Sequence, residues 1–272
     1  MKRSLHIVLI GGALLAAVPA HATPSTTVWA EGTASIQGFL VPHVTYDTYF
    51  WKGVVAGAAG SPIYPVTTGL TMGVLPFDKV NMEVGFDLSL PSEDPLLLNA
   101  KIGTPEDALF AGSPAIGVGV MGIGTKDGAT NYDVVYGQVQ KSLPWGGFIS
   151  VGGYYGAGAE SLFTNSDGDV VRAGFMGGIA APDIVLNLSW LKKIVLTADV
   201  QTGKNVFGAI GVAPSFYFTD TISLLTGPVF FLDGKAQPGG RDVLWTFQLD
   251  IDLPLRPAPP AAPPAATSAS AK

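Results

Sequence analysis

Apolar and polar residues alternate without a break along residues 79–90. Every even position from Val80 to Leu90 is apolar, and every odd position from Lys79 to Ser89 is polar or glycine. A period of two predicts an extended strand with one apolar face and one polar face. In a soluble sheet the apolar face meets a protein core, whereas in a membrane barrel it meets lipid and the polar face lines a lumen.

The same alternation recurs along the chain and predicts twelve strands. They are expected at 35–50, 65–75, 79–90, 96–103, 115–124, 131–143, 148–156, 169–180, 193–201, 206–218, 222–232 and 242–253. An even strand count with alternating short turns and longer loops is typical of a transmembrane barrel. Short turns are expected at 76–78, 144–147 and 219–221, although the connections at 104–114 and 181–192 are longer. Residues 183–192 also alternate in part, so an extra strand there is the alternative.

Two positions interrupt the expected pattern. Pro42 predicts a kink or bulge in the first strand, and a slip of the apolar phase near Met121 predicts a bulge.

Aromatic residues mark the strand ends. Two aromatic belts are expected where rings meet lipid headgroups. The outer belt would comprise Tyr46, Tyr49, Phe50, Trp51, Tyr154, Tyr155, Phe230, Phe231 and Trp245, and the inner belt Phe77, Trp145, Trp190, Phe216 and Phe218.

Composition agrees with a membrane-exposed sheet. The 272 residues include 35 glycines, and only 13% are charged, whereas roughly 25% is usual in soluble domains. No uninterrupted apolar run of about 18 residues occurs after the N-terminus, which argues against membrane-spanning helices. A closed barrel suits an exported chain without disulfides because closure leaves no unpaired strand edge.

The two ends of the chain differ from its middle. Residues 1–22 are expected to be a cleaved secretory signal, with a basic start, an apolar centre and Ala20-His21-Ala22 at the cleavage site. Residues 23–34 are expected to form a leader, and 35–254 the barrel. Residues 255–272 are rich in proline and alanine and are expected to form a disordered periplasmic tail.

Charge and residue counts exclude several classes of function. Loss of Lys2 and Arg3 with the signal leaves 13 of 15 basic residues beside 21 acidic ones, a net charge of −8. This charge argues against nucleic acid as a partner. The absence of cysteine excludes thiolate metal sites, disulfides and cysteine catalysis. No cofactor and no metal site are predicted.

The signal, the strand ladder, the belts and the alternation of turns and loops together resemble a Gram-negative outer-membrane β-barrel. The chain is most similar to porin-like and transporter-like barrels, in segments such as 99–106, 134–137 and 203–205. The resemblance implies an all-β, closed antiparallel barrel in the cell outer membrane, in contact with lipid and folded by the barrel-assembly machinery. Such barrels usually end on an aromatic residue, so an assembly signal here is expected within 245–253.

The polar face of the strands supplies the candidate functional residues. We expect a polar, mildly acidic lumen that carries small hydrophilic solutes. The residues expected to line it are His43, Asp47, Glu83, Asp87, Asn99, Lys101, Arg172, Asp199, Gln201, Gln248 and Asp250. The alternative is a structural or interaction barrel that binds a partner through its outer loops or its periplasmic tail.

His43 is the single histidine of the expected mature chain, so a hydrolase of the Ser/His/Asp kind would depend on it. Asp47 lies four residues further along the same face and permits a pair. The spacing assigns no nucleophilic serine, and we interpret His43 as a polar residue of the lumen. The chain is therefore predicted not to be an enzyme.

Overall fold

The computed structural model describes residues 27–51, 54–55, 66–90, 92–237 and 239–255. The expected signal peptide, residues 23–26 of the expected leader, and residues 256–272 of the expected tail lie outside the described residues. The domain boundaries proposed at these places stay predictions.

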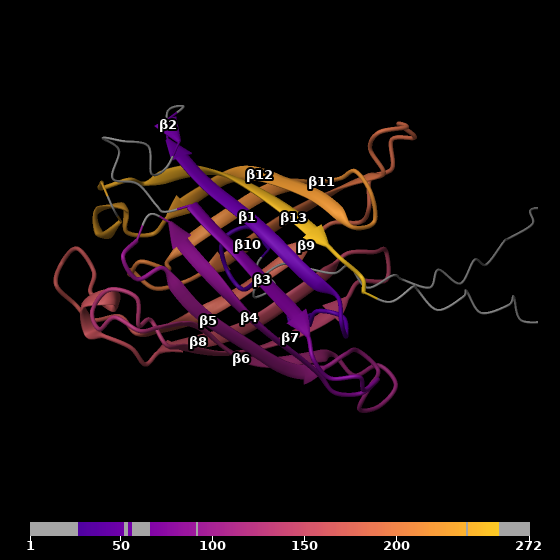
Figure 1. Cartoon of the computed structure of the whole chain (residues 1–272), viewed down its shortest axis with the longest axis horizontal. Coiled ribbons are helices and arrows are strands. Elements are labelled where there is room, and N and C mark those ends of the chain that lie inside the picture. The colour runs from indigo at the N-terminus through magenta and orange to yellow at the C-terminus, as the bar shows by residue number, and fades with distance from the viewer. Residues whose placement is uncertain (1–26, 52–53, 56–65, 91, 238, 256–272) are drawn as a thin grey trace, which may run out of the picture.

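Twelve antiparallel strands form one closed barrel, in which each strand pairs with its neighbours in the chain (Figure 1). The barrel strands are β1 (Pro42–Trp51), β3 (Val66–Gly73), β4 (Asn81–Leu90), β5 (Leu96–Thr104), β6 (Ala115–Gly124), β7 (Val134–Ser142), β8 (Phe148–Gly156), β9 (Ala173–Ala180), β10 (Lys193–Gln201), β11 (Ala209–Tyr217), β12 (Ile222–Phe231) and β13 (Val243–Asp252). A two-residue strand, β2 (Val54–Val55), extends the end of β1.

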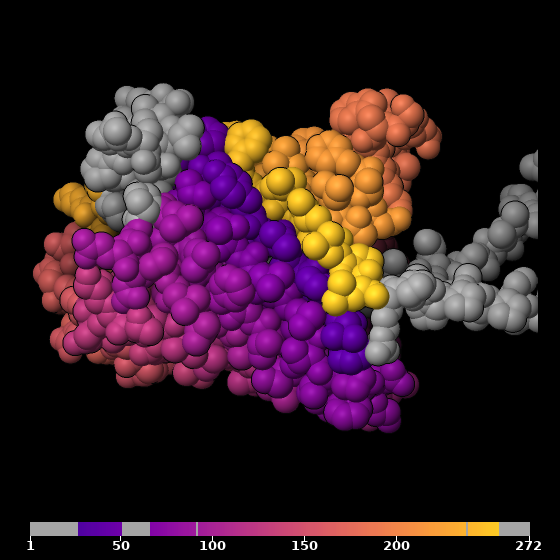
Figure 2. Space-filling view, viewed as in Figure 1, coloured from indigo at the N-terminus to yellow at the C-terminus, as the bar shows by residue number. Residues whose placement is uncertain are grey.

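The first and last strands close the barrel. β1 pairs with β13 from His43 opposite Asp252 to Phe50 opposite Trp245, and the two strands lie side by side on the surface in Figure 2. We call the end of the barrel where β1 begins and β13 finishes the proximal end, and the opposite end the distal end. If the N-terminus lies in the periplasm, the proximal end is the periplasmic one.

The two faces of the wall differ in chemistry as the alternation predicts. On β4, Val84 is 39% exposed on the outer face while its neighbour Glu83 is 1% exposed inside. The outer face carries exposed apolar side chains on every side of the barrel, among them Leu98, Val118, Val135, Ile149, Phe175, Leu196, Val212 and Phe247. An apolar exterior around a polar, closed interior is the arrangement of a transmembrane β-barrel.

Helical structure in the described residues is limited to two short 3₁₀ turns, η1 (Glu160–Phe163) and η2 (Gly234–Ala236). None of the helices in this part of the chain is long and apolar enough to cross a membrane.

The predicted strands are confirmed, with differences at their ends. β1 begins at Pro42 rather than at residue 35, because residues 27–38 turn away from the sheet. The predicted bulge near Met121 is present, since the β5–β6 register shifts between Leu98 and Ala100 and Gly122 has a φ of 63°. Residues 181–192 form a connection with isolated bridges at Ile184 and Leu188, not an extra strand.

Three residues predicted for the outer aromatic belt lie inside the barrel instead. Tyr154 and Phe231 are buried, and Tyr49 packs against an interior apolar cluster. Their sequence neighbours Tyr155 and Phe230 are exposed on the outer face. In each of these aromatic pairs only one ring can face lipid, because successive residues of a strand point to opposite faces.

Candidate functional site

The interior of the barrel is occupied by the chain itself. Residues 27–38, which we call the lumen segment, precede β1 and form no regular helix or strand. Most of the segment is buried, including Val28, Glu31 and Thr33, which are almost completely inaccessible. The segment joins β1 at the proximal end, where Phe39 forms a bridge with Gly73. Part of the expected leader and the start of the expected first strand thus lie in the lumen.

The Asp199 carboxylate on β10 holds the first turn of the segment. Its Oδ2 accepts hydrogen bonds from the backbone N–H groups of Val28 (2.5 Å), Trp29 (2.8 Å) and Ala30 (3.1 Å). The Thr27 hydroxyl donates a fourth, at 2.6 Å. Several N–H donors around one carboxylate compensate the cost of burying its charge. Asp199 therefore acts as an anchor for the backbone.

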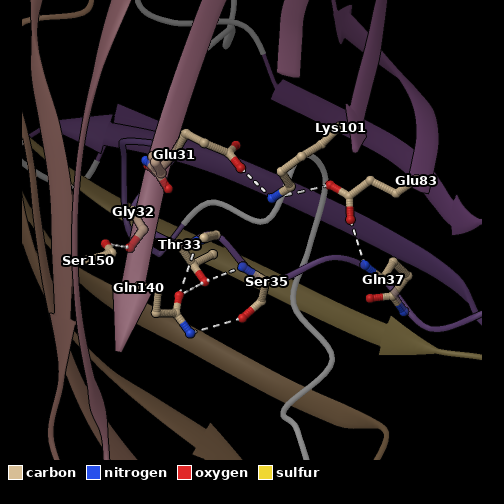
Figure 3. A network of polar contacts seen from close by, with 11 residues as sticks. Glu31, Gly32, Thr33, Ser35, Gln37, Glu83, Lys101, Gln140 and Ser150 are labelled. Carbon is tan, nitrogen blue, oxygen red and sulfur yellow. Dashed lines mark hydrogen bonds and ion pairs between the residues drawn. The ribbon is translucent and has the colours of Figure 1, made fainter. Parts of the chain in front are cut away.

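Polar side chains from β7 and β8 hold the middle of the segment (Figure 3). Gln138 donates to the Glu31 carbonyl, and the Ser150 hydroxyl donates to the Gly32 carbonyl. The side-chain oxygen of Gln140 accepts from the Ala34 N–H at 3.0 Å and from the Thr33 hydroxyl. These wall residues satisfy the backbone as a neighbouring strand would.

A buried ion network joins the segment to β4 and β5. Lys101 Nζ lies 2.6 Å from Glu31 Oε1 and 3.4 Å from Glu83 Oε1, and the two carboxylates approach the ammonium from different sides in Figure 3. Glu83 also accepts the backbone N–H of Gln37 at 2.6 Å. Since a buried charge without a partner is costly, the fit of Glu31 depends on Lys101.

Two wall glycines leave space for the segment. A Cβ added to Gly178 would lie 2.5 Å from the Gly32 carbonyl oxygen, and its three nearest atoms would all belong to Gly32. A Cβ added to Gly211 would lie 2.7 Å from Cβ of Val28. Gly178 and Gly211 flank Asp199 on adjacent strands. The wall is therefore hollowed where the segment passes.

Apolar side chains close the distal half of the interior. Val28 packs in a buried cluster with residues such as Leu225 and Leu244, and Trp29 meets the rings of Tyr49 and Phe231 edge to face. A second buried cluster gathers Val134, Tyr136, Tyr154, Phe163 and Met176. We expect a polar, mildly acidic lumen from the sequence, and the structure adds two buried apolar clusters in its distal half.

His43 lies between two carboxylates at the proximal end. Its Nδ1 is 2.7 Å from Asp252 Oδ1, and its Nε2 is 3.5 Å from Asp250 Oδ1. Gln37 of the lumen segment also donates to Asp252, at 2.9 Å. Both ring nitrogens thus face carboxylates rather than a hydroxyl, which is not the arrangement of a general base with its nucleophile.

The remaining candidate residues occupy three different places. Asp47 and Asp87 are half-buried on the inner face, and Asn99 donates to Asp87 at 2.5 Å. Gln201 and Gln248 are buried, and Gln248 donates to the Val28 carbonyl at 2.6 Å. Arg172 lies just before β9 at the distal end, where it donates to the carbonyls of Gly156 and Gly158 and braces that loop. Whether these residues line a solute path stays a prediction.

The residues that sequence reasoning missed are those of the lumen segment. The segment has no strand or helix period that would mark it as part of the fold. One signal could have indicated the position of the segment. Glu31 is acidic and would need a cation if it were buried, and Lys101 is a lysine expected on the inner face.

The chain is similar to several solved structures, at low sequence identity. No family model matches the chain, and no curated protein matches it. An outer membrane channel from Pseudomonas putida F1 is similar with a TM-score of 0.42 and 11% identity, over 78% of this chain and 94% of that one. The porin NanC gives a TM-score of 0.44 and 8% identity, over 78% and 98%. A protein from a study of in-meso membrane-protein crystallization gives 0.46 and 12%, over 78% and 84%.

Proposed function

We propose that the protein is an outer-membrane channel for small hydrophilic solutes, exported through a cleaved signal peptide and folded by the barrel-assembly machinery. The observation that carries this proposal is a closed barrel with an apolar outer wall and buried polar side chains from several strands inside. A barrel that served only as a membrane scaffold would not need ionised groups in its interior, where they are costly.

The occupied lumen makes the channel closed at rest. The lumen segment fills the interior between the β4–β5 wall and the β8–β11 wall, through Lys101 on one side and Asp199 on the other. Solute passes when the segment is displaced. Withdrawal of the segment uncovers Asp199 and the Lys101–Glu83 pair, beside the half-buried Asp47 and Asp87. Carboxylates then outnumber ammonium groups along the open lumen, which favours cations.

Current through the purified chain in planar bilayers tests the proposal. We expect rare, small openings from the parent chain and larger, steadier current from Gly178→Val, because the added side chain meets only the lumen segment among its nearest neighbours. Gly137→Val is the control, since a Cβ there meets nothing closer than 3.8 Å. A folded Gly178→Val barrel without current would refute the channel.

Charge selectivity is measured in the same bilayers under a salt gradient. The reversal potential of Gly178→Val should show cation preference, and adding Asp47→Asn and Asp87→Asn should reduce it. Adding Asp78→Asn, which changes an exposed turn outside the barrel wall, should leave it unchanged. Anion preference in Gly178→Val would contradict the role of the carboxylates.

The filled interior also favours a second candidate, a barrel that conducts nothing and binds a partner through its outer loops or tail. The same experiment separates the two, because this candidate predicts no current from either the parent or Gly178→Val.

A further inference from the structure

We propose that the inner wall of the barrel is a peptide-binding site, and that residues 27–38 are its resident ligand. The site would accept the same peptide chemistry from a separate chain once the resident segment is displaced. This inference goes beyond the proposed channel, because it concerns what the wall binds and not what passes through.

The first step is that the wall binds main-chain atoms. Six side chains from five strands make hydrogen bonds with backbone groups of the segment. The wall residues and their backbone partners are Asp199 with the N–H groups of Val28, Trp29 and Ala30, Gln248 with the Val28 carbonyl, Gln138 with the Glu31 carbonyl, Ser150 with the Gly32 carbonyl, Gln140 with the Ala34 N–H, and Glu83 with the Gln37 N–H. The wall side chains therefore satisfy main-chain groups of the segment whatever side chains those positions carry.

The second step is that the barrel makes specific contacts with the side chains at three positions of the segment. Val28 is buried in the distal apolar cluster, and Trp29 donates its indole N–H to the Phe207 carbonyl at 2.8 Å. Glu31 requires the Lys101 ammonium. These contacts give the site a preference for an apolar residue, an aromatic residue and a carboxylate at fixed spacing.

The third step is that small residues occupy three buried positions of the segment. Ala30, Gly32 and Ala34 are buried, and Gly32 lies against Gly178 with no room for a Cβ on the wall glycine. The ligand class is therefore a peptide of the pattern apolar, aromatic, small, acidic, small, matching residues 28–32, with a bend at residues 27–30.

The tether explains why the resident segment holds the site. The segment continues directly into β1 through residues 39–41, so binding is intramolecular and its effective concentration is high. A free peptide competes only when the resident segment is weakened without altering the wall.

The experiment displaces the resident segment in the full chain. In the double variant Val28→Asp/Glu31→Lys, a carboxylate enters the apolar cluster beside Asp199 and an ammonium faces Lys101, while the wall is unchanged. A fluorescent synthetic peptide of residues 27–38 is then titrated into the detergent-solubilised barrel and followed by anisotropy. We expect saturable binding to the double variant and at least about 100-fold weaker binding to the parent chain, whose site is occupied.

A second peptide provides the matched control. The peptide that carries the same two substitutions should bind the double variant at least about 100-fold more weakly than the parent peptide, since it repels Lys101 and Asp199 as the displaced segment does. Equal binding of both peptides, or equal binding of the parent peptide to both chains, would overturn the proposal. If the double variant does not fold, Glu31→Lys alone is titrated with the parent peptide and its Glu31→Lys counterpart under the same criteria.

The readout separates this inference from the channel. Peptide binding is measured without current, so a double variant that binds the peptide but never conducts would refute the proposed function and leave the peptide site standing. A double variant that conducts but shows no selective binding would refute the peptide site and support the channel.

Discussion

At the scale of single residues, Lys101 neutralises two buried carboxylates that belong to different parts of the chain. Replacing it by Met should leave Glu31 and Glu83 facing each other without a cation. Removal of one partner from a buried ion network costs about 3–5 kcal/mol, so the free energy of unfolding in urea should fall by that order. Lys192→Met is the matched control, because Lys192 pairs with Asp220 on an exposed connection, and such pairs contribute about 0–1 kcal/mol. Equal losses in the two variants would show that burial of the network is not what matters.

Val84 and Glu83 are adjacent on β4 and should respond to substitution in opposite ways. Val84→Arg places a charge on the lipid-facing wall and should hinder assembly by roughly 2–4 kcal/mol if the residue sits near the bilayer midplane. Glu83→Gln should leave assembly intact, because the amide keeps an acceptor for the Gln37 N–H, while it weakens the hold on Lys101. Recovery of folded barrel in outer-membrane fractions measures both, and equal recovery would contradict the orientation assigned to this strand.

At the scale of elements, Asp233 joins two distal loops. Its carboxylate accepts the Ser166 N–H at 2.8 Å and the Ala236 N–H at 3.3 Å. Burial tends to raise the pKa of Asp233, but these hydrogen bonds to the ionised form outweigh it and lower the pKa below its usual value of 3.8.

The sign of this pKa shift fixes the expected pH dependence. A lowered folded-state pKa stabilises the loop contact fully above the unfolded value, and the contribution disappears as pH falls through the folded value. The hydrogen-exchange protection factor of the Ser166 amide should therefore stay constant from neutral pH to about pH 4 and fall below it. Asp233→Ala should remove the protection at every pH, and protection that rises on acidification would contradict the assignment.

The strands could be predicted from sequence and the lumen segment could not, for one physical reason. Residues 79–90 face lipid on one side and the interior on the other, so each position carries the chemistry of its surroundings and the period is visible. Residues 27–38 lie among wall side chains, and many of their backbone bonds are made by residues more than a hundred positions away, such as Gln138 and Asp199. No local pattern records such partners. The pairing of Glu31 with Lys101 could be recognised only from the strand register, which places Lys101 opposite Glu83.

At the scale of the whole molecule, barrel closure depends on β13, and the described closing contacts end at Leu255. β13 pairs with both β12 and β1, the Leu253 N–H donates to the Pro42 carbonyl at 2.8 Å, and the Leu255 N–H donates to the Leu40 carbonyl at 3.2 Å. A chain that ends at Leu255 should therefore assemble and conduct like the full chain, as shown by membrane recovery and bilayer current. A chain that ends at Asp242 should not assemble, because it leaves the edges of β1 and β12 unpaired.

The pair of truncations also locates the assembly signal. We expect residues 245–253 to carry this signal. The chain that ends at Leu255 retains these residues, and the chain that ends at Asp242 lacks them. If the chain ending at Leu255 fails to reach the membrane although β13 is intact, residues 256–272 contribute to assembly, and the barrel-assembly machinery reads more than the last strand. If that chain assembles and conducts but loses a periplasmic partner in pull-down, the tail binds the partner and the barrel is independent of it. Since the apolar wall and the hydrogen-bonded closure are complete without the tail, we expect assembly to proceed in its absence.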